Sequence, residues 1–109
     1  METMAEQRMI AETIHQQLGG ARLSVMTGAK DFVICESGLK FRLSSRRTRD
    51  KINMVQITLT PADLYRIEWM SIRTKKGVMT VDVVAEDNDV FVENLIPLFE
   101  YRTGLYTRL

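Results

Sequence analysis

The chain has 109 residues, of which 45% are hydrophobic and 27% are charged. This length fits one domain over residues 1–109, and the composition excludes a disordered protein. Fifteen Lys and Arg residues against fourteen Asp and Glu residues give a formal net charge of +1, which excludes a strong overall attraction to nucleic acid or to membranes.

The N-terminal segment predicts an amphipathic helix over residues 4–18. Thr3 and Glu6 fit the capping box, in which both side chains accept hydrogen bonds from backbone amides at the helix start. Gly19 and Gly20 are expected to end the helix. Its apolar face repeats at four-residue spacing, at Ile10, Ile14 and Leu18.

In the middle of the chain, apolar and polar residues alternate with the period of two that half-buried strands show. Residues 22–26 form a short candidate strand, and the apolar run 32–35 fits a strand that is buried on both faces. Ser37 and Gly38 suit a hairpin turn. The clearest alternating segments are residues 39–43, 55–59, 65–69 and 79–83.

The connections between the later strands carry turn signals. Lys75, Lys76 and Gly77 separate two alternating segments and predict a hairpin. Residues 60–63 read Thr-Pro-Ala-Asp, which also fits the start of a helix, but the strand period that follows them favours a turn.

A second helix is predicted near the C-terminus. Asp87, Asn88 and Asp89 offer capping oxygens and negative charge for its N-terminal end. Pro97 has no amide hydrogen, so a kink or two short turns are expected there, and Gly104 suits the helix end. The expected apolar face consists of Phe91, Leu95, Leu98 and Phe99.

The order of these elements predicts an α+β fold. Helices and strands do not alternate as they do in parallel sheets, so we expect an antiparallel meander of about five to six strands. The N-terminal and C-terminal helices are expected to cover its apolar face.

Few side chains offer a catalytic centre or a metal site. His15, the single histidine, is expected at the surface or boundary of the first helix. Cys35, the single cysteine, excludes an internal disulfide, favours a reducing cytoplasm and is expected in the core. The acidic residues within 82–89 lack the calcium-loop pattern. We therefore predict no catalytic residue, no metal and no cofactor.

Three further features have structural interpretations. Residues 27–30, Thr-Gly-Ala-Lys, lack the second glycine of a phosphate-binding loop and predict a turn. Tyr65 and Trp69 share a strand face and are expected in the core rather than as a platform on which bases stack. No run of about eighteen apolar residues is present, so we expect no contact with a membrane and a cytoplasmic location.

Residues 44–51 are the most informative local feature. Four of these eight residues are basic, and guanidinium groups bind phosphate or carboxylate oxygens in pairs, so they indicate an anionic partner. A solvated loop is the alternative. Lys75 and Lys76 extend the patch if both turns lie at one end of the sheet. The predicted partner-binding residues are Arg46, Arg47, Arg49, Lys51, Lys75 and Lys76.

Charges are unevenly distributed along the chain. Residues 22–51 hold eight basic and three acidic residues, whereas residues 78–100 hold six acidic residues and no basic one. This pattern predicts two electrostatic poles.

Five segments resemble a family of small uncharacterised proteins encoded by bacteriophages and prophages. The resemblance implies an accessory protein of a mobile element that acts in a bacterial cytoplasm by binding a host protein or nucleic acid. The family brings no assigned activity or catalytic residue, and the basic loop 46–51 is not part of the shared pattern. The segments are residues 16–20, 25–30, 38–43, 63–65 and 103–107.

Three hypotheses on function follow. The first is a non-enzymatic accessory protein of phage type that binds a host macromolecule, either nucleic acid or a host or defence protein, through the basic loop. The second is an enzyme that acts through carboxylates such as Glu68 and Asp82. The third is a structural or homo-oligomeric subunit, which the seven Met residues and the apolar C-terminal helix favour.

Overall fold

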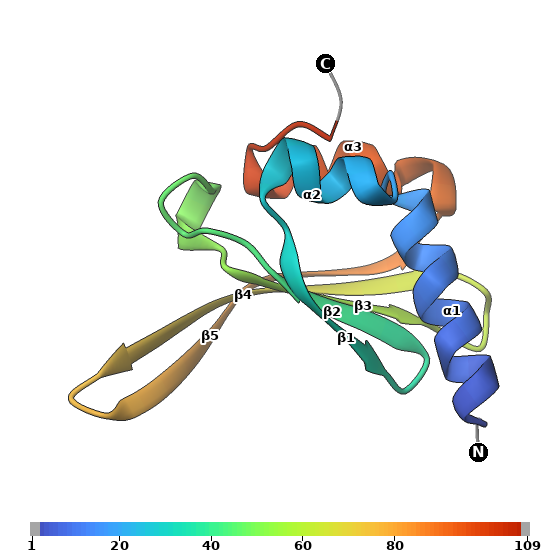
Figure 1. Cartoon of the computed structure of the whole chain (residues 1–109), viewed down its shortest axis with the longest axis horizontal. Helices are drawn as coiled ribbons and strands as arrows, with labels where there is room; N and C mark the ends of the chain where they lie inside the picture. Colours follow the sequence, from blue (N-terminus) through green and yellow to red (C-terminus); the bar gives the residue numbers. More distant parts are fainter. Residues whose placement is uncertain (1–2, 108–109) are drawn as a thin grey trace.

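A computed structural model describes residues 3–107 and has the predicted α+β fold (Figure 1). Five antiparallel strands form one sheet in the order β1-β2-β3-β4-β5, and a helix lies at each end of the chain. The strands are β1 (Lys30–Cys35), β2 (Gly38–Arg42), β3 (Met54–Leu59), β4 (Tyr65–Lys75) and β5 (Val78–Val90). The helical segments are α1 (Met4–Gln17), α2 (Ala21–Thr27), α3 (Leu95–Thr103) and the 3-10 turns η1 (Arg49–Lys51) and η2 (Val92–Asn94).

The core lies between one face of the sheet and the helices (Figure 1). Phe99 of α3 packs between Phe41 of β2 and Trp69 of β4, with ring centroids 6.3 and 6.2 Å apart. Tyr65 is buried on the same face of β4, as predicted for it and for Trp69. The register aligns Phe41, Val55, Trp69 and Ala85 across four strands. None of the helices within residues 3–107 covers the opposite face of the sheet (Figure 1).

The first helix and the Thr3 half of its capping box are confirmed. The Thr3 hydroxyl accepts a hydrogen bond from the Glu6 amide at 3.1 Å. Ile14 and Leu18 are fully buried, and Leu18 is the residue that ends α1. The four-residue repeat therefore packs α1 onto β1 and β2.

The predicted strand over residues 22–26 is wrong, because these residues belong to α2. Gly19 and Gly20, with φ of 120° and 61°, turn the chain and allow a second helix to start at once. Leu23 and Thr27, four residues apart, are buried, whereas Val25 is 82% exposed. Residues 27–30 accordingly connect a helix to a strand and do not form a hairpin turn.

The predicted helix start at Asp87, Asn88 and Asp89 is also wrong, because β5 continues to Val90. Pairing with β4 overrides the local capping signal. The C-terminal helix α3 begins at Leu95, directly after η2. Pro97 is its third residue, where a backbone amide has no helical partner, so this position tolerates proline. Gly104 ends the helix with a left-handed φ of 74°, as predicted.

The first edge strand is more exposed than predicted. Phe32, Val33 and Ile34 are 36%, 48% and 43% exposed, and Cys35 is only half-buried rather than in the core. Strand β1 has one neighbour, β2, so its outer edge and one face meet solvent. The hairpin turn between β1 and β2 lies one residue earlier than expected. Cys35 pairs with Gly38, and Ser37 is the turn residue with a positive φ, of 57°.

Candidate anion-binding surface

The predicted basic residues lie at one end of the sheet. Arg42 pairs with Met54, and Met54 pairs with Met70, so the β2–β3 loop, residues 43–53, leaves the sheet beside the middle of β4. Strands β4 and β5 continue beyond this point as a two-stranded arm, residues 71–82 (Figure 1). Lys75 and Lys76 lie at its tip. The loop and the arm therefore share one end of the sheet.

A hollow of about 380 Å³ lies between the β2–β3 loop and the arm. Three cations from three segments line it, and no carboxylate does. We call it the basic hollow. Its residues are Lys30, Arg42, Leu43, Ser44, Ser45, Arg46, Asn53, Ile72 and Thr74.

The register of the sheet explains how these cations meet. Lys30 opens β1 and pairs with Arg42 at the end of β2, so their side chains share a face of the sheet. Arg46 follows four residues later in the loop. Sequence reasoning predicted Arg46 but missed Lys30 and Arg42, which are distant from each other along the chain. The sequence did contain one indication that Arg42 belongs to this surface. Arg42 is a polar position of an alternating strand and comes directly before the basic loop.

Asn53 fixes the loop to the arm. Its side chain donates a hydrogen bond to the Ile72 carbonyl at 2.8 Å and accepts one from the Ile72 amide at 2.7 Å. Its own amide donates to the Met70 carbonyl at 2.9 Å. The β2–β3 loop and the arm, which both line the basic hollow, are therefore joined through Asn53. Its side chain forms the same pair of hydrogen bonds to Ile72 that a neighbouring strand would form.

The cations of the basic hollow have no acidic partner within residues 3–107. The ion pairs in this part of the chain are Arg66 with Glu86 at 3.1 Å and Arg102 with Asp87 at 2.9 Å. Three neighbouring positive charges without a counterion raise the local potential, which a bound anion lowers. Guanidinium groups and hydroxyl groups together are suitable donors for phosphate oxygens.

Two of the predicted arginines lie at the ends of helices instead. Arg47 Nη1 is 3.7 Å from the position that a Cβ on Gly28 would occupy, and Gly28 ends α2. The Arg49 side chain lies in the same way against Gly104, which ends α3, and its guanidinium is 5.8 Å from the Tyr101 ring centroid. A cation there stabilises the negative end of the helix dipole. Both arginines therefore lie at helix ends, a placement that the sequence did not reveal.

The remaining predicted residues are exposed. Lys51 is in η1, beside the basic hollow in sequence but not in its lining. Lys75 and Lys76 are exposed at the tip of the arm. Of the six predicted residues, the structure brings Arg46 into the basic hollow and places the lysines around the same end of the sheet.

The carboxylates considered for catalysis do not face each other. Glu68 pairs with Glu86, and Asp82 pairs with Ser71, three residues further along β4, so the two acids lie on opposite faces. Within residues 3–107, no three His, Cys, Asp or Glu side chains lie close enough to hold a metal ion.

Asp87 instead joins the sheet to α3. Its carboxylate accepts hydrogen bonds from Trp69 Nε1 at 2.7 Å and from Arg102 Nε and Nη2, both at 2.9 Å. The hydrogen bond from Arg102 lowers the pKa of Asp87; partial burial opposes this shift, and the Trp69 hydrogen bond reinforces it. The carboxylate is therefore held in its charged form as a structural group.

Asp87→Asn is expected to lower the free energy of unfolding at pH 7 by about 1–2 kcal/mol, because an amide cannot accept from both Arg102 nitrogens. The folded-state pKa lies below the unfolded value of about 3.9. The contribution of the charge is thus complete above about pH 4 and is lost as the pH falls through the lowered folded-state pKa. Urea unfolding at a series of pH values should show the wild type and Asp87→Asn converging in that window.

Glu86→Gln is the matched control, because Glu86 pairs with Arg66 in solvent on the opposite face of β5. No measurable change in unfolding free energy is expected for it. A difference between Asp87→Asn and the wild type that stays constant down to acidic pH would contradict the role of the charge.

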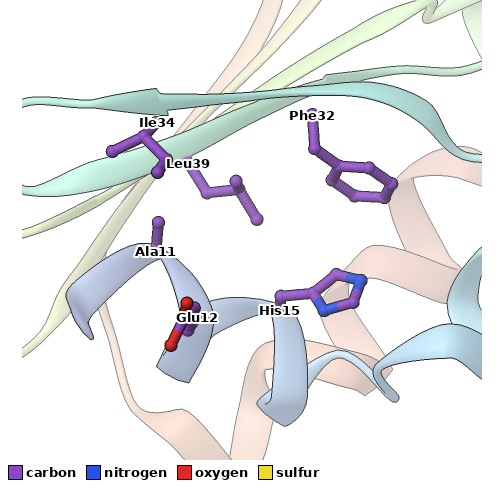
Figure 2. A pocket seen from close by; sticks show the side chains of 6 residues that line it. All are labelled: Ala11, Glu12, His15, Phe32, Ile34 and Leu39. Atoms are coloured by element: carbon purple, nitrogen blue, oxygen red, sulfur yellow. The ribbon is translucent and has the colours of Figure 1, made fainter. Parts of the chain in front are cut away.

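A second pocket, of about 310 Å³, lies between α1 and the face of β1 and β2 that is turned toward this helix (Figure 2). The half-buried His15 ring meets the Phe32 ring edge-on, with centroids 5.0 Å apart, which confirms the predicted boundary position of His15. Glu12 and apolar side chains complete the lining. The lining contains no Lys or Arg, so its chemistry differs from that of the basic hollow.

Comparisons of the chain with models of protein families, with curated proteins and with solved structures found no match. The resemblance to phage-encoded proteins therefore stays a prediction. None of the helices within residues 3–107 is long and apolar enough to cross a membrane.

Proposed function

We propose that the protein is a non-enzymatic binding protein that holds nucleic acid by its phosphate groups in the basic hollow. The observation that carries the proposal is the convergence of Lys30, Arg42 and Arg46 on one hollow without an acidic lining residue. Ser44, Ser45 and Thr74, three residues that carry hydroxyl groups, belong to the same lining. Arg, Lys, Ser and Thr side chains are the usual donors to phosphate oxygens in complexes with nucleic acids.

An extended polyanion fits this surface better than an isolated anion. Arg73, Lys75 and Lys76 are exposed and add positive charge to the arm beyond the basic hollow. Arg73 and Lys75 alternate with the lining residues Ile72 and Thr74, so they lie on the other face of the narrow arm. A strand that passes around the arm can contact these cations as well as the hollow, and the counterions it releases then drive binding. An acidic host protein is the competing partner, and the experiment below separates the two.

The test uses a double substitution in the basic hollow, Arg42→Ala with Arg46→Ala. Binding to a labelled 20-nucleotide single strand and to a duplex is measured by fluorescence anisotropy at several salt concentrations. Affinity at about 0.1 M salt should fall about tenfold, and the slope of log K against log salt should become shallower by about two units, one for each lost phosphate contact.

Arg8→Ala with Arg22→Ala is the matched control, because it removes the same charge from exposed helix positions. Its affinity and salt slope should equal those of the wild type. Equal loss in both variants would show that net charge alone drives binding. Undiminished binding in the hollow variant would exclude this site, and nuclease-resistant capture of a protein that requires Arg42 and Arg46 would replace nucleic acid with an acidic protein partner.

A further inference from the structure

Strand β5 is an unprotected sheet edge. It is 13 residues long, and its one neighbour within the described sheet is β4. Exposed edges are usually blocked by Lys, by Pro or by a covering element. Residues 78–90 contain no Lys, Arg or Pro. Residues 78–84 are exposed, and they include Val78, Met79, Val81, Val83 and Val84 at 65%, 64%, 47%, 54% and 38%.

The other edge of the sheet is different. Strand β1 has six residues, and its pairing with β2 is interrupted between Lys30 and Val33. It also begins with a lysine, and Asp31 has a positive φ of 56°. These are features that oppose pairing with another strand. Strand β5 has irregularities of its own, the two shifts in its pairing with β4 and the positive φ of 54° at Asp89, but they lie outside residues 78–83, so this segment is the regular part of the two edges.

We propose that a second copy of this chain pairs with β5 in antiparallel fashion, about a two-fold axis at Val81. This register places Met79 opposite Val83, Thr80 opposite Asp82, and Val81 opposite Val81. Each apolar side chain meets an apolar partner, and each Asp82 carboxylate meets a hydroxyl instead of another charge. The segment is therefore complementary to itself, as a two-fold interface requires.

Neighbouring registers fit less well. Two directly opposed residues of an antiparallel pair either both form hydrogen bonds to the partner strand or both form none. This orientation alternates along a strand, so in a symmetric pair the two-fold axis must pass between two copies of the same residue. An axis at Asp82 would set two carboxylates against each other. An axis at Thr80 would set Asp82 against Val78. With the axis at Val81, unlike the two neighbouring axes, Asp82 lies opposite neither another acid nor an apolar side chain.

The local shape of β5 sets the length of the interface. The arm turns at Lys76 and Gly77, and the pairing with β4 shifts between Trp69 and Met70, where Val84 has no partner in the register. Such a bulge bends a strand and ends regular pairing. The regular segment, residues 78–83, contains all five positions that the proposed register uses.

The pairing gives the dimer a defined surface. Val81 pairs with Ile72, and Met79 pairs with Thr74, so both share the face of the arm that lines the basic hollow. A two-fold axis perpendicular to the sheet keeps that face on one side in both copies. Two basic hollows then open on the same side of a continuous sheet. The pairing itself does not depend on nucleic-acid binding.

Sedimentation equilibrium of the full chain tests the pairing. We expect a dimer for the wild type at about 0.1 mM and a dissociation constant at least tenfold higher for Val81→Lys, which sets two ammonium groups against each other at the axis. Val25→Lys, an equal change at an 82% exposed position of α2, should leave the dimer intact. A monomeric wild type, or equal association of the two lysine variants, would overturn the proposal.

The register is tested by cross-linking in a Cys35→Ser background. Val81→Cys should form a disulfide-linked dimer on mild oxidation, because directly opposed residues bring their Cβ atoms within disulfide reach. Thr80→Cys should not, because Asp82 lies opposite it. Cross-linking of Thr80→Cys in place of Val81→Cys would overturn the Val81 axis.

Discussion

Phe99→Ala is expected to lower the free energy of unfolding by about 4 kcal/mol. The Phe99 side chain is fully buried and contacts both the Phe41 and the Trp69 rings, so it joins α3 to two strands at once. Its removal loses the transfer energy of an aromatic ring and leaves a cavity that the rigid sheet cannot close, and such changes cost about 3–5 kcal/mol. Urea unfolding followed by the fluorescence of Trp69, the single tryptophan, measures the effect directly.

Phe91→Ala is the matched control. Phe91 precedes η2 and is 54% exposed, so the same chemical change should cost less than about 1 kcal/mol. A Phe99→Ala variant as stable as Phe91→Ala would mean that α3 does not pack on the sheet as described.

The elements that the sequence predicts correctly are those whose burial repeats locally. The spacing of Ile10, Ile14 and Leu18 reflects one buried helix face, and alternation in β3 and β4 reflects one buried sheet face. In these segments the local period and the tertiary contacts agree, so the pattern alone indicates the structure.

The predictions that were wrong fall where contacts between residues distant in sequence determine the secondary structure. Within α2, Leu23 and Val25 mimic strand alternation, but only the i, i+4 pair of Leu23 and Thr27 faces the core. Asp87 has the composition of a helix cap, yet it pairs with Ile67 in the sheet and meets Arg102 from α3. No local window contains those partners.

The candidate site was predictable in part for the same reason. A run of basic residues predicts an anion-binding loop, and Arg46 of this run lines the basic hollow. Lys30 and Arg42 join it only because β1 and β2 pair in a particular register. Arg47 and Arg49 are not in its lining and lie where two helices end beside the loop, at Gly28 and Gly104. Neither effect is visible before the strands and helices are placed.

The basic hollow and the β5 edge lie on the same arm, which links the two proposals physically. A dimer with two hollows on one side can engage two stretches of one strand, and the second contact then forms at high effective concentration. Val81→Lys adds a cation on the face of the arm that lines the basic hollow, so strands of two lengths must be compared. Fluorescence anisotropy should show a lower affinity for a long single strand relative to the affinity for a short one than in the wild type.

Gly38→Ala is expected to be the other severely destabilising substitution, at about 3 kcal/mol or more. A Cβ at Gly38 would lie 2.1 Å from the Ile57 carbonyl oxygen and 3.1 Å from Thr58 Cα, both in the backbone of β3. Gly38 pairs with Thr58 on one side and Cys35 on the other, so neither strand can move away without breaking sheet hydrogen bonds. Overpacking usually lowers the free energy of unfolding by about 1–3 kcal/mol, and a clash that displaces backbone should cost at least the upper value.

Gly77→Ala separates this steric effect from conformational strain. Gly77 has a φ of 78° with nothing within 4 Å of an added Cβ, whereas Gly38 lacks a positive φ and has no space. Gly77→Ala should thus cost only the left-handed backbone strain, about 1–2 kcal/mol. Urea unfolding of the two variants compares them directly. If Gly38→Ala were no less stable than Gly77→Ala, β2 and β3 would not approach so closely, and the steric requirement for glycine at position 38 would be wrong.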